Sequence, residues 1–165
     1  MIFETGTVNL EEQIVSILLE KGLTLTTAES CTAGLIASRL VNVPGISSVF
    51  MQGYITYSNE SKQSLIGVSE ETLNTYGAVS PQVAGEMAKG AAKAAGCDVA
   101  VSCTGIAGPD GGTALKPVGL VYIGCLVKGK LTVLENHFQG SRQQVREASC
   151  EKALELLLTC LTANE

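Results

Sequence analysis

The sequence predicts an α/β fold, in which helices are layered on a sheet. Segments rich in β-branched residues alternate along the chain with segments whose apolar residues recur at helical spacing. The chain has 165 residues, of which 45% are hydrophobic, so it is long enough and apolar enough to form one sizeable core. Two late strand-like segments are joined by a short turn that contains glycine, which indicates an antiparallel hairpin. We therefore expect a single domain over residues 1–165.

Capping residues mark the helix boundaries in the first half of the chain. Asn9 and Ser69 are good N-caps, and Gly22 and Gly77 end the same two helices because glycine adopts the left-handed conformation easily. The expected elements, in order, are a helix from Asn9 to Gly22, a strand at 23–28, a helix from Ser30 to about Asn42, a strand at 49–58, a helix at 59–66 and a short helix from Ser69 to Gly77. Strands and helices therefore alternate, as they do in open α/β sheets.

The second half adds a helix, a strand, a hairpin and a long last helix. Ser80 and Pro81 form an N-cap and first-turn pair, and Gln144 follows Ser141 at the spacing of a capping box. The expected elements are a helix at 82–95, a buried strand at 97–103, hairpin strands at 119–127 and 131–138 that turn at 128–130, and a helix from Ser141. Alanine and glycine are frequent at 82–95, so we expect this helix to pack very close to a neighbour.

Composition limits the classes of partner and cofactor. The net charge of −5, without a cluster of lysines or arginines, argues against nucleic acid as the main partner. The N-terminus has no signal-peptide pattern, and the longest apolar run, 119–127, is too short to span a membrane. The six cysteines show no CxxC pairing, which is typical of reduced thiols in a cytoplasmic protein and predicts no metal site. The one histidine, His137, lies in a predicted strand, so a mechanism that needs no histidine is favoured.

Ser30 stands where a predicted strand ends and a predicted helix begins. Ligands of open α/β sheets bind at the carboxyl ends of the strands, and a helix start offers free N–H groups to an anion. Ser30 could therefore be a nucleophile. It could equally be an ordinary N-cap, because serine is one of the best capping residues.

Lys62 lies about one turn inside the predicted helix that follows the second strand. Near the positive end of a helix dipole and partly desolvated, a lysine amine has a lowered pKa and can act as a base at neutral pH. Glu60 and Ser61 are candidate partners of the amine, and Tyr57 adds a hydroxyl at the same strand end. The alternative is a lysine that only contacts solvent.

A loop of four glycines in eight residues, Gly105–Gly112, follows the predicted buried strand at 97–103. Glycines let backbone N–H groups approach a ligand closely, which is how anion-binding loops form. The loop lacks the lysine of a Walker A motif, and a plain surface turn is the alternative. Arg142, in the first turn of the last helix, is unfavourable beside the helix dipole and hints at an anionic partner such as a phosphate. The alternative is an arginine that is only exposed to solvent.

At these residues the chain resembles the CinA C-terminal family, which includes nicotinamide-nucleotide amidases. The resemblance covers about Leu10 to Leu161, the expected core of the domain. The matching motifs, in order, are Thr27–Thr32, Tyr57–Lys62, Thr104–Thr113, Lys116–Gly119 and Gly140–Arg146. This family resemblance implies a three-layer α/β/α sandwich and a homodimer. It also implies hydrolysis of the carboxamide of nicotinamide mononucleotide (NMN) without metal or other cofactor. Larger family members carry a further N-terminal domain, whose pyrophosphatase activity we do not assign here.

Carried over by motif, the resemblance implies that Ser30 is the nucleophile and Lys62 the base, with Tyr57 and Thr104 assisting. The predicted substrate-binding residues are Glu29, Cys31, Thr32, Gly105, Gly108 and Arg142. The family commonly has glycine where this chain has Ala33. Two alternatives stay open: Cys31 as the nucleophile of a cysteine amidase, and a nucleotide-binding or regulatory module without catalysis.

Overall fold

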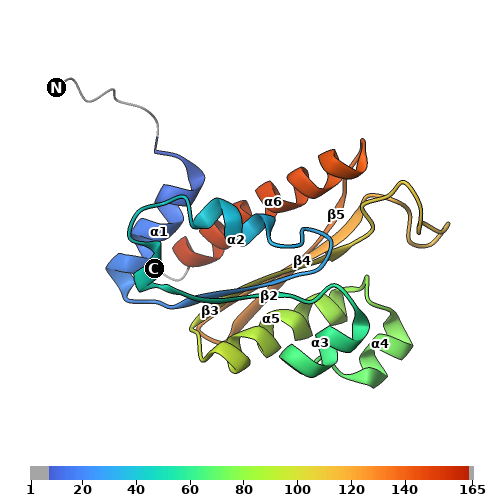
Figure 1. The fold of residues 1–165 in the computed structure, drawn as a ribbon, viewed down its shortest axis with the longest axis horizontal. Helices are drawn as coiled ribbons and strands as arrows, with labels where there is room; N and C mark the ends of the chain where they lie inside the picture. The colour runs from blue at the N-terminus through green and yellow to red at the C-terminus, as the bar shows by residue number, and fades with distance from the viewer. Residues whose placement is uncertain (1–7, 164–165) are drawn as a thin grey trace.

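The computed structural model describes residues 8–163, which form a five-stranded sheet between two layers of helices (Figure 1). The strands are β1 (Leu25–Glu29), β2 (Phe50–Ile55), β3 (Val99–Gly105), β4 (Leu120–Val127) and β5 (Lys130–His137). The helices are α1 (Leu10–Lys21), α2 (Leu35–Leu40), α3 (Asn59–Ile66), α4 (Glu70–Tyr76), α5 (Pro81–Ala95) and α6 (Arg142–Thr162), with a 3-10 turn, η1 (Ile46–Ser48). The predicted α/β/α sandwich with a mixed sheet is confirmed.

The sheet order is β2-β1-β3-β4-β5. Strands β2, β1 and β3 run parallel, whereas β4 and β5 form an antiparallel hairpin beside β3. Glu29 at the end of β1 pairs with Ile55 of β2 and with Cys103 of β3. The carboxyl ends of the three parallel strands therefore meet at one edge of the sheet, where ligands of such sheets bind.

Each face of the sheet has its own core. Odd-numbered residues of β3, such as Val101 and Cys103, face α1, α2 and α6 in the larger core. Even-numbered residues face α5: Ala100 packs with Ala88 and Ala92 of that helix. Figure 1 shows the same division, with α1, α2 and α6 above the sheet and α3, α4 and α5 below it. Strand alternation in the sequence thus sends one set of side chains to each layer.

The predicted caps are confirmed. Asn9 and Glu12 form a capping box at α1, and Ser141 and Gln144 form one at α6. The hairpin turns at Lys128 and Gly129, which both have positive φ, the backbone that a two-residue hairpin turn requires. The boundaries that capping chemistry marks are therefore the ones that the sequence predicts best.

The prediction of a helix beginning at Ser30 was wrong. Residues 31–34 form a turn, with Ala33 at φ 48° and Gly34 at φ 97°, and α2 begins only at Leu35. Ser30 is therefore not the N-cap of this helix. The left-handed backbone at position 33 also explains why glycine suits that place, since alanine there costs about 1 kcal/mol.

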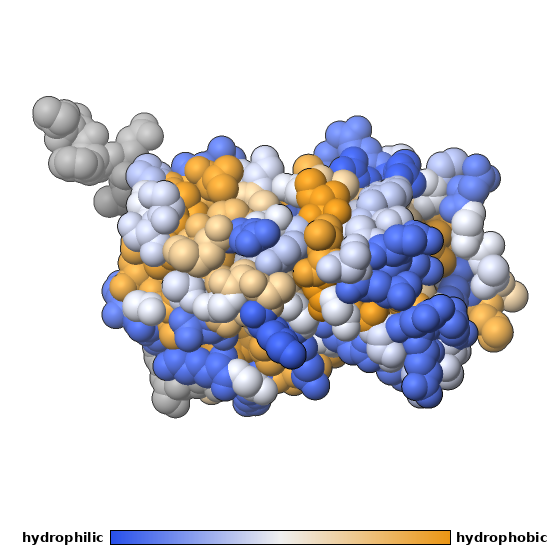
Figure 2. Space-filling view, turned by 60° about the horizontal axis from the view of Figure 1, so that its bottom comes forward, coloured by the Kyte–Doolittle hydropathy of each residue, from blue (hydrophilic) through white to orange (hydrophobic). Residues whose placement is uncertain are grey.

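Helix α5 packs very close to α3, as its small residues predict. A Cβ at Gly90 would lie 1.8 Å from the carbonyl oxygen of Ile66, so only glycine fits there. On the side of the molecule that Figure 2 presents, apolar residues form separate patches between hydrophilic ones. Within residues 8–163, we find no helix with the length and apolar character needed to cross a bilayer.

Candidate active site

A cavity of about 220 Å³ opens where β1, β2 and β3 end. Each of the three sequence motifs that follow these strands contributes to its wall. The lining residues are Ser30, Cys31, Tyr57, Asn59, Lys62, Ala78, Val79, Thr104, Gly105, Ala107 and Arg142. The sheet therefore brings all four predicted catalytic residues, and Cys31, Gly105 and Arg142 of the predicted substrate-binding set, to one place.

Ser30 and Lys62 are in hydrogen-bond contact inside this cavity. The Lys62 Nζ lies 3.1 Å from the Ser30 Oγ. Ser30 is held by the sheet, because its N–H donates to the Cys103 carbonyl at 2.9 Å and so extends the β1–β3 ladder by one bond. Ser30 is 8% exposed and lines the cavity, so a small molecule in the cavity can reach it. This contact is the geometry of a nucleophile beside its base.

The Lys62 amine is buried, and its exposed fraction is 1%. Besides Ser30, it contacts the carbonyl oxygens of Thr56 at 2.9 Å and Tyr57 at 3.3 Å. Burial lowers the pKa of Lys62 to about 8, and the nearby Cys31 thiolate opposes this shift only in part. The expected partners Glu60 and Ser61 were the wrong ones: Ser61 bonds to Ser58, and Glu60 is exposed.

A neutral amine fits these three contacts. A neutral lysine has two N–H groups and one lone pair, and the two carbonyl oxygens can accept only from N–H groups. With both N–H groups directed at Thr56 and Tyr57, the lone pair points to the Ser30 hydroxyl. The same two carbonyls then stabilise the charged amine after it takes a proton.

Glu29 does not line the cavity; its carboxylate caps α2. One oxygen accepts from the N–H groups of Gly34 (3.0 Å) and Ile36 (3.1 Å), and the other accepts from Ala37 (2.9 Å). The side chain is 1% exposed. The free N–H groups that we expected α2 to offer to an anion are therefore occupied by Glu29 itself. Glu29 was predicted to contact the substrate, and its position outside the cavity wall does not support that prediction.

Arg146 on α6 holds the turn that follows Ser30. Its Nε donates to the Cys31 carbonyl at 2.9 Å and its Nη2 to the Thr32 carbonyl at 3.1 Å. Thr32 is fully buried and stands outside the cavity wall. No role was predicted for Arg146 from the sequence, although it lies one turn after Arg142 in the same matching motif.

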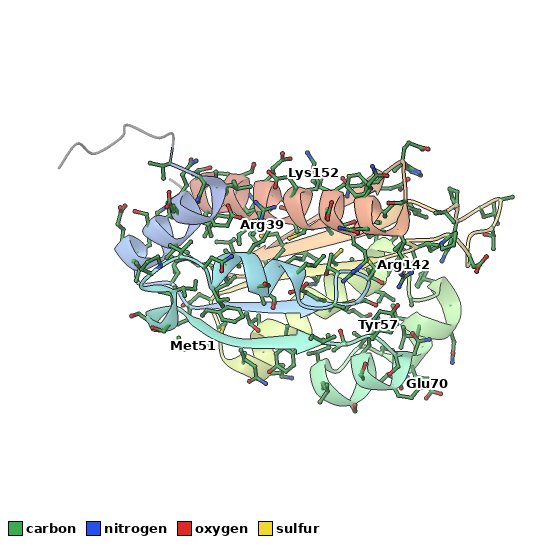
Figure 3. All side chains as sticks on the ribbon, turned by 45° about the horizontal axis from the view of Figure 1, so that its top comes forward. Arg39, Met51, Tyr57, Glu70, Arg142 and Lys152 are labelled. Atoms are coloured by element: carbon green, nitrogen blue, oxygen red, sulfur yellow. The ribbon has the colours of Figure 1, made fainter. Side chains whose placement is uncertain are left out.

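Arg142 and Tyr57 meet at the mouth of the cavity, and Figure 3 labels both at the same end of the sheet. The Arg142 Nη2 donates to the Tyr57 Oη at 3.0 Å, and the Nη1 donates to the Gly108 carbonyl at 2.9 Å. Both acceptors are neutral oxygens, and no carboxylate within residues 8–163 forms an ion pair with Arg142. The guanidinium charge is therefore available to an anionic ligand.

Only the start of the glycine-rich loop reaches the cavity. Gly105 and Ala107 line it, whereas the segment 110–115 is exposed and projects beyond the sheet (Figure 1). Gly108 is buried at φ 82° and contributes its carbonyl to Arg142, not an N–H group to the cavity wall. The prediction that the glycine-rich loop approaches a ligand therefore applies only to the first residues of the loop.

Thr104 and Gly105 present fixed groups to the cavity. The Thr104 hydroxyl donates to the Ala78 carbonyl at 2.8 Å, so its lone pairs are left to accept. The Ile106 N–H donates to Leu120 on β4, and successive N–H groups of a strand point to opposite sides. The Gly105 N–H therefore points toward β1, beyond the last ladder bond at Ser30.

Cys31 lines the cavity and touches Cys103. The two Sγ atoms lie 3.6 Å apart, and both thiols are free. The contact with Cys103 lowers the pKa of Cys31, whereas contact with Cys31 and burial raise the pKa of Cys103 well above its usual value. In the part of the chain that the structure describes, no three metal-ligating side chains cluster together. His137 is exposed on β5 and contacts Glu135, away from this cavity.

Comparison with known proteins gives one consistent family. The family model of the CinA C-terminal domain matches residues 7–161. A competence-damage inducible protein of Clostridium novyi is 55% identical over 156 residues, and one of Clostridium botulinum (strain Okra) is 53% identical over the same length. Each alignment covers 94% of this chain but 38% of the relative, so the chain spans little more than a third of those proteins.

Solved structures agree with the sequence comparison. The competence/damage inducible protein CihA of Agrobacterium tumefaciens superposes with a TM-score of 0.89 at 41% identity, covering 98% of this chain and 99% of that one. A CinA superfamily protein of Klebsiella pneumoniae superposes with a TM-score of 0.90 at 31% identity, covering 96% and 99%.

Proposed function

The chain belongs to the CinA C-terminal domain family, and on that premise we propose that it is a nicotinamide-nucleotide amidohydrolase. It hydrolyses the carboxamide of NMN to nicotinic acid mononucleotide and ammonia. Ser30 is the nucleophile and Lys62 its base. The observation that carries the proposal is the 3.1 Å contact between the Ser30 Oγ and a buried lysine amine whose other two neighbours are carbonyl oxygens.

The reaction begins with a proton transfer. The lone pair of Lys62 takes the Ser30 proton as the Oγ attacks the carboxamide carbon, which is made electrophilic by the pyridinium ring of NMN. The charged amine then gives this proton to the leaving nitrogen, and ammonia departs. A water molecule activated by the same amine cleaves the acyl-enzyme in the second half of the reaction.

The oxyanion of the tetrahedral intermediate needs fixed donors, which the cavity can supply from the backbone. The Gly105 N–H is one candidate, because it points past the end of the β1–β3 ladder toward the space beside Ser30. A Cβ at Gly105 would lie 2.6 Å from a Val121 methyl group and 2.8 Å from the Leu120 carbonyl oxygen. Close packing against β4 thus keeps this backbone segment in place. A donor that needs no reorganisation is the kind that stabilises a transition state most.

The remaining polar groups suit the two ends of the substrate. The Thr104 hydroxyl, whose own proton goes to Ala78, can accept from a carboxamide N–H. Arg142 at the mouth can pair with the phosphate of NMN, since guanidinium and phosphate form bidentate contacts. Tyr57 orients this guanidinium. The homodimer that the family resemblance implies stays a prediction.

Ser30 is preferred to Cys31 as the nucleophile because of where the amine points. The Lys62 Nζ is in hydrogen-bond contact with the Ser30 hydroxyl, whereas the Cys31 sulfur contacts the Cys103 thiol. The non-catalytic alternative has no geometric feature in its favour, because a binding module gains nothing from a buried amine of lowered pKa.

The test is ammonia release from NMN by the protein and by two lysine variants. We expect Lys62→Ala to lose at least about a hundredfold in kcat/KM, the lower end of the range for loss of a general base. Lys89→Ala, which removes an exposed lysine of α5, is the matched control and should keep full activity.

Two results would count against the amidase. Tight binding of NMN in calorimetry without ammonia release would favour the binding module. Full activity of Lys62→Ala would exclude the proposed base.

A further inference from the structure

Two thiols meet beneath the candidate active site, and the proposed hydrolysis uses neither of them. Cys31 is 5% exposed and lines the cavity, and Cys103 is fully buried behind it on β3. Their sulfurs are 3.6 Å apart, close to van der Waals contact. Cys31 is the residue next to Ser30, so chemistry at this sulfur acts on the backbone that carries the nucleophile.

We propose that Cys31 is a site of oxidation by hydrogen peroxide, that Cys103 resolves it to a disulfide, and that this disulfide inactivates the Ser30–Lys62 site. The inference goes beyond the amidase proposal, because the thiol chemistry needs neither NMN nor its hydrolysis.

The chemistry has two steps. In the first, the Cys31 thiolate attacks one oxygen of hydrogen peroxide, the O–O bond breaks, and the leaving hydroxide takes a proton to become water. Cys31 is then a sulfenic acid. In the second, the Cys103 sulfur attacks the Cys31 sulfur, an S–S bond forms and the S–O bond breaks. The hydroxide leaves with the Cys103 proton as a second water, so two thiols and one peroxide give one disulfide and two waters.

The surroundings suit each thiol to its step. Cys31 borders an open cavity that admits a molecule as small as peroxide. The 3.6 Å contact with Cys103 lowers the pKa of Cys31 and so favours the Cys31 thiolate, the form that attacks peroxide. Cys103 is shielded from solvent and meets the oxidant only through Cys31. The pair therefore has one accessible and one resolving sulfur.

Cys97 and Cys150 lack this combination, whereas Cys125 and Cys160 form a second interacting pair far from Ser30 in sequence, in which contact with Cys125 lowers the pKa of Cys160 to about 6. Cys150 is buried on α6, where burial raises the pKa of its thiol to about 11. Cys97 is more accessible, but burial raises its pKa too, and its sulfur contacts the Ala95 carbonyl. The extent of oxidation at Cys97 and Cys150 therefore serves as an internal control for the effects of accessibility and of thiol pKa.

Disulfide formation has a direct consequence for Ser30. The sulfurs must approach from 3.6 Å to about 2 Å, the length of an S–S bond. Cys103 sits inside the sheet, whereas Cys31 opens the 31–34 turn, which is held by the Arg146 side chain rather than by a ladder. The turn is therefore the part that moves. A displacement of about 1 Å at a reacting atom can cost a hundredfold in rate.

The experiment treats the whole protein with hydrogen peroxide, quenches free thiols with an alkylating reagent, and maps peptides by mass spectrometry. We expect a cross-linked peptide pair that contains Cys31 and Cys103, formed before Cys97 or Cys150 is modified and removed by dithiothreitol. In the Cys103→Ser variant, Cys31 should instead accumulate as a sulfenic acid that dimedone traps. If that variant does not fold, the order of modification in the wild-type protein decides the question alone.

Two further readouts separate this inference from the amidase proposal. The oxidised protein should show a Ser30 Oγ to Lys62 Nζ distance longer than 3.1 Å in its crystal structure, whether or not NMN is a substrate. Ammonia release from NMN should fall about a hundredfold and return with dithiothreitol. The proposal would be overturned if Cys31 and Cys103 stayed free at a peroxide level that already modifies Cys97. It would also be overturned if the disulfide formed and left the Ser30–Lys62 contact unchanged.

Discussion

The strand-to-helix connections after β1 and after β2 each contain serine, yet Ser30 and Ser58 have opposite roles. Ser58, between β2 and α3, is an ordinary N-cap whose Oγ accepts from the Ser61 N–H at 3.1 Å. Ser30, directly after β1, caps nothing, and its hydroxyl contacts Lys62. Glu29 caps α2 instead, because its carboxylate accepts hydrogen bonds from three N–H groups.

The comparison shows how a serine is kept available for chemistry. A serine at a helix start is normally engaged by the backbone, because its oxygen satisfies an N–H group that has no other partner. At α2 a buried carboxylate satisfies these groups instead, and the four-residue turn at 31–34 separates Ser30 from the helix. The hydroxyl is thereby left to the amine.

The largest effect is expected from removing the free serine. Ser30→Ala deletes the nucleophile, so ammonia release from NMN should fall by at least about a thousandfold while the fold is kept. Circular dichroism and the midpoint of thermal unfolding check that the fold is kept.

Ser58→Ala is the matched change at the second connection. Loss of this N-cap should lower the free energy of unfolding by about 1 kcal/mol and leave a far larger share of activity than Ser30→Ala does. Equal loss of activity in the two variants would break the distinction between the serines.

The next effect tests whether Glu29 is a cap. Glu29→Ala leaves three buried N–H groups without an acceptor, so the free energy of unfolding should fall by about 3 kcal/mol. Glu29→Gln keeps one acceptor oxygen and should lose less. Urea unfolding of the two variants measures both values, and an unchanged stability of Glu29→Ala would show that the carboxylate is not needed at α2.

Capping chemistry explains how much of this could be predicted from the sequence. Asn9, Ser80 and Ser141 each mark a helix start correctly, because a cap and its partner lie within a few residues of each other. Ser30 looked the same from the sequence, since nothing local shows that Glu29 replaces it as the acceptor. The helix start was therefore misplaced by five residues, from Ser30 to Leu35.

The site was predictable only in outline. The sequence places three residues near the ends of three predicted strands: Ser30, Lys62 and Thr104. Because these strands run parallel, they bring the three residues together. The Thr56 and Tyr57 carbonyls at Lys62, and the Arg146 contacts to the 31–34 turn, were not visible. Any residue type can supply a backbone carbonyl, so the sequence does not indicate which ones contact Lys62. The Arg146 contacts join residues more than a hundred positions apart, so no local sequence pattern predicts them.

A smaller effect is expected at the mouth of the cavity. Arg142→Ala removes the charge proposed to meet the phosphate, and loss of a charge-assisted contact should raise KM for NMN about tenfold to a hundredfold. Nicotinamide riboside, the same amide without its phosphate, should show little change. An equal rise in KM for both compounds would show that Arg142 does not recognise the phosphate.

The most direct test of the central claim is the pH dependence of kcat/KM for NMN together with the pH dependence of stability. Burial lowers the pKa of Lys62 to about 8, so kcat/KM should rise tenfold per pH unit below this value, as the amine loses its proton, and level off above it. The folded protein holds fewer protons than the unfolded chain between about 8 and the ordinary lysine value of 10.5. The free energy of unfolding should therefore rise across this interval relative to Lys62→Met, which does not titrate. A kcat/KM that is flat from pH 6 to 9, or that falls as the amine deprotonates, would contradict a neutral Lys62 acting as the base of Ser30.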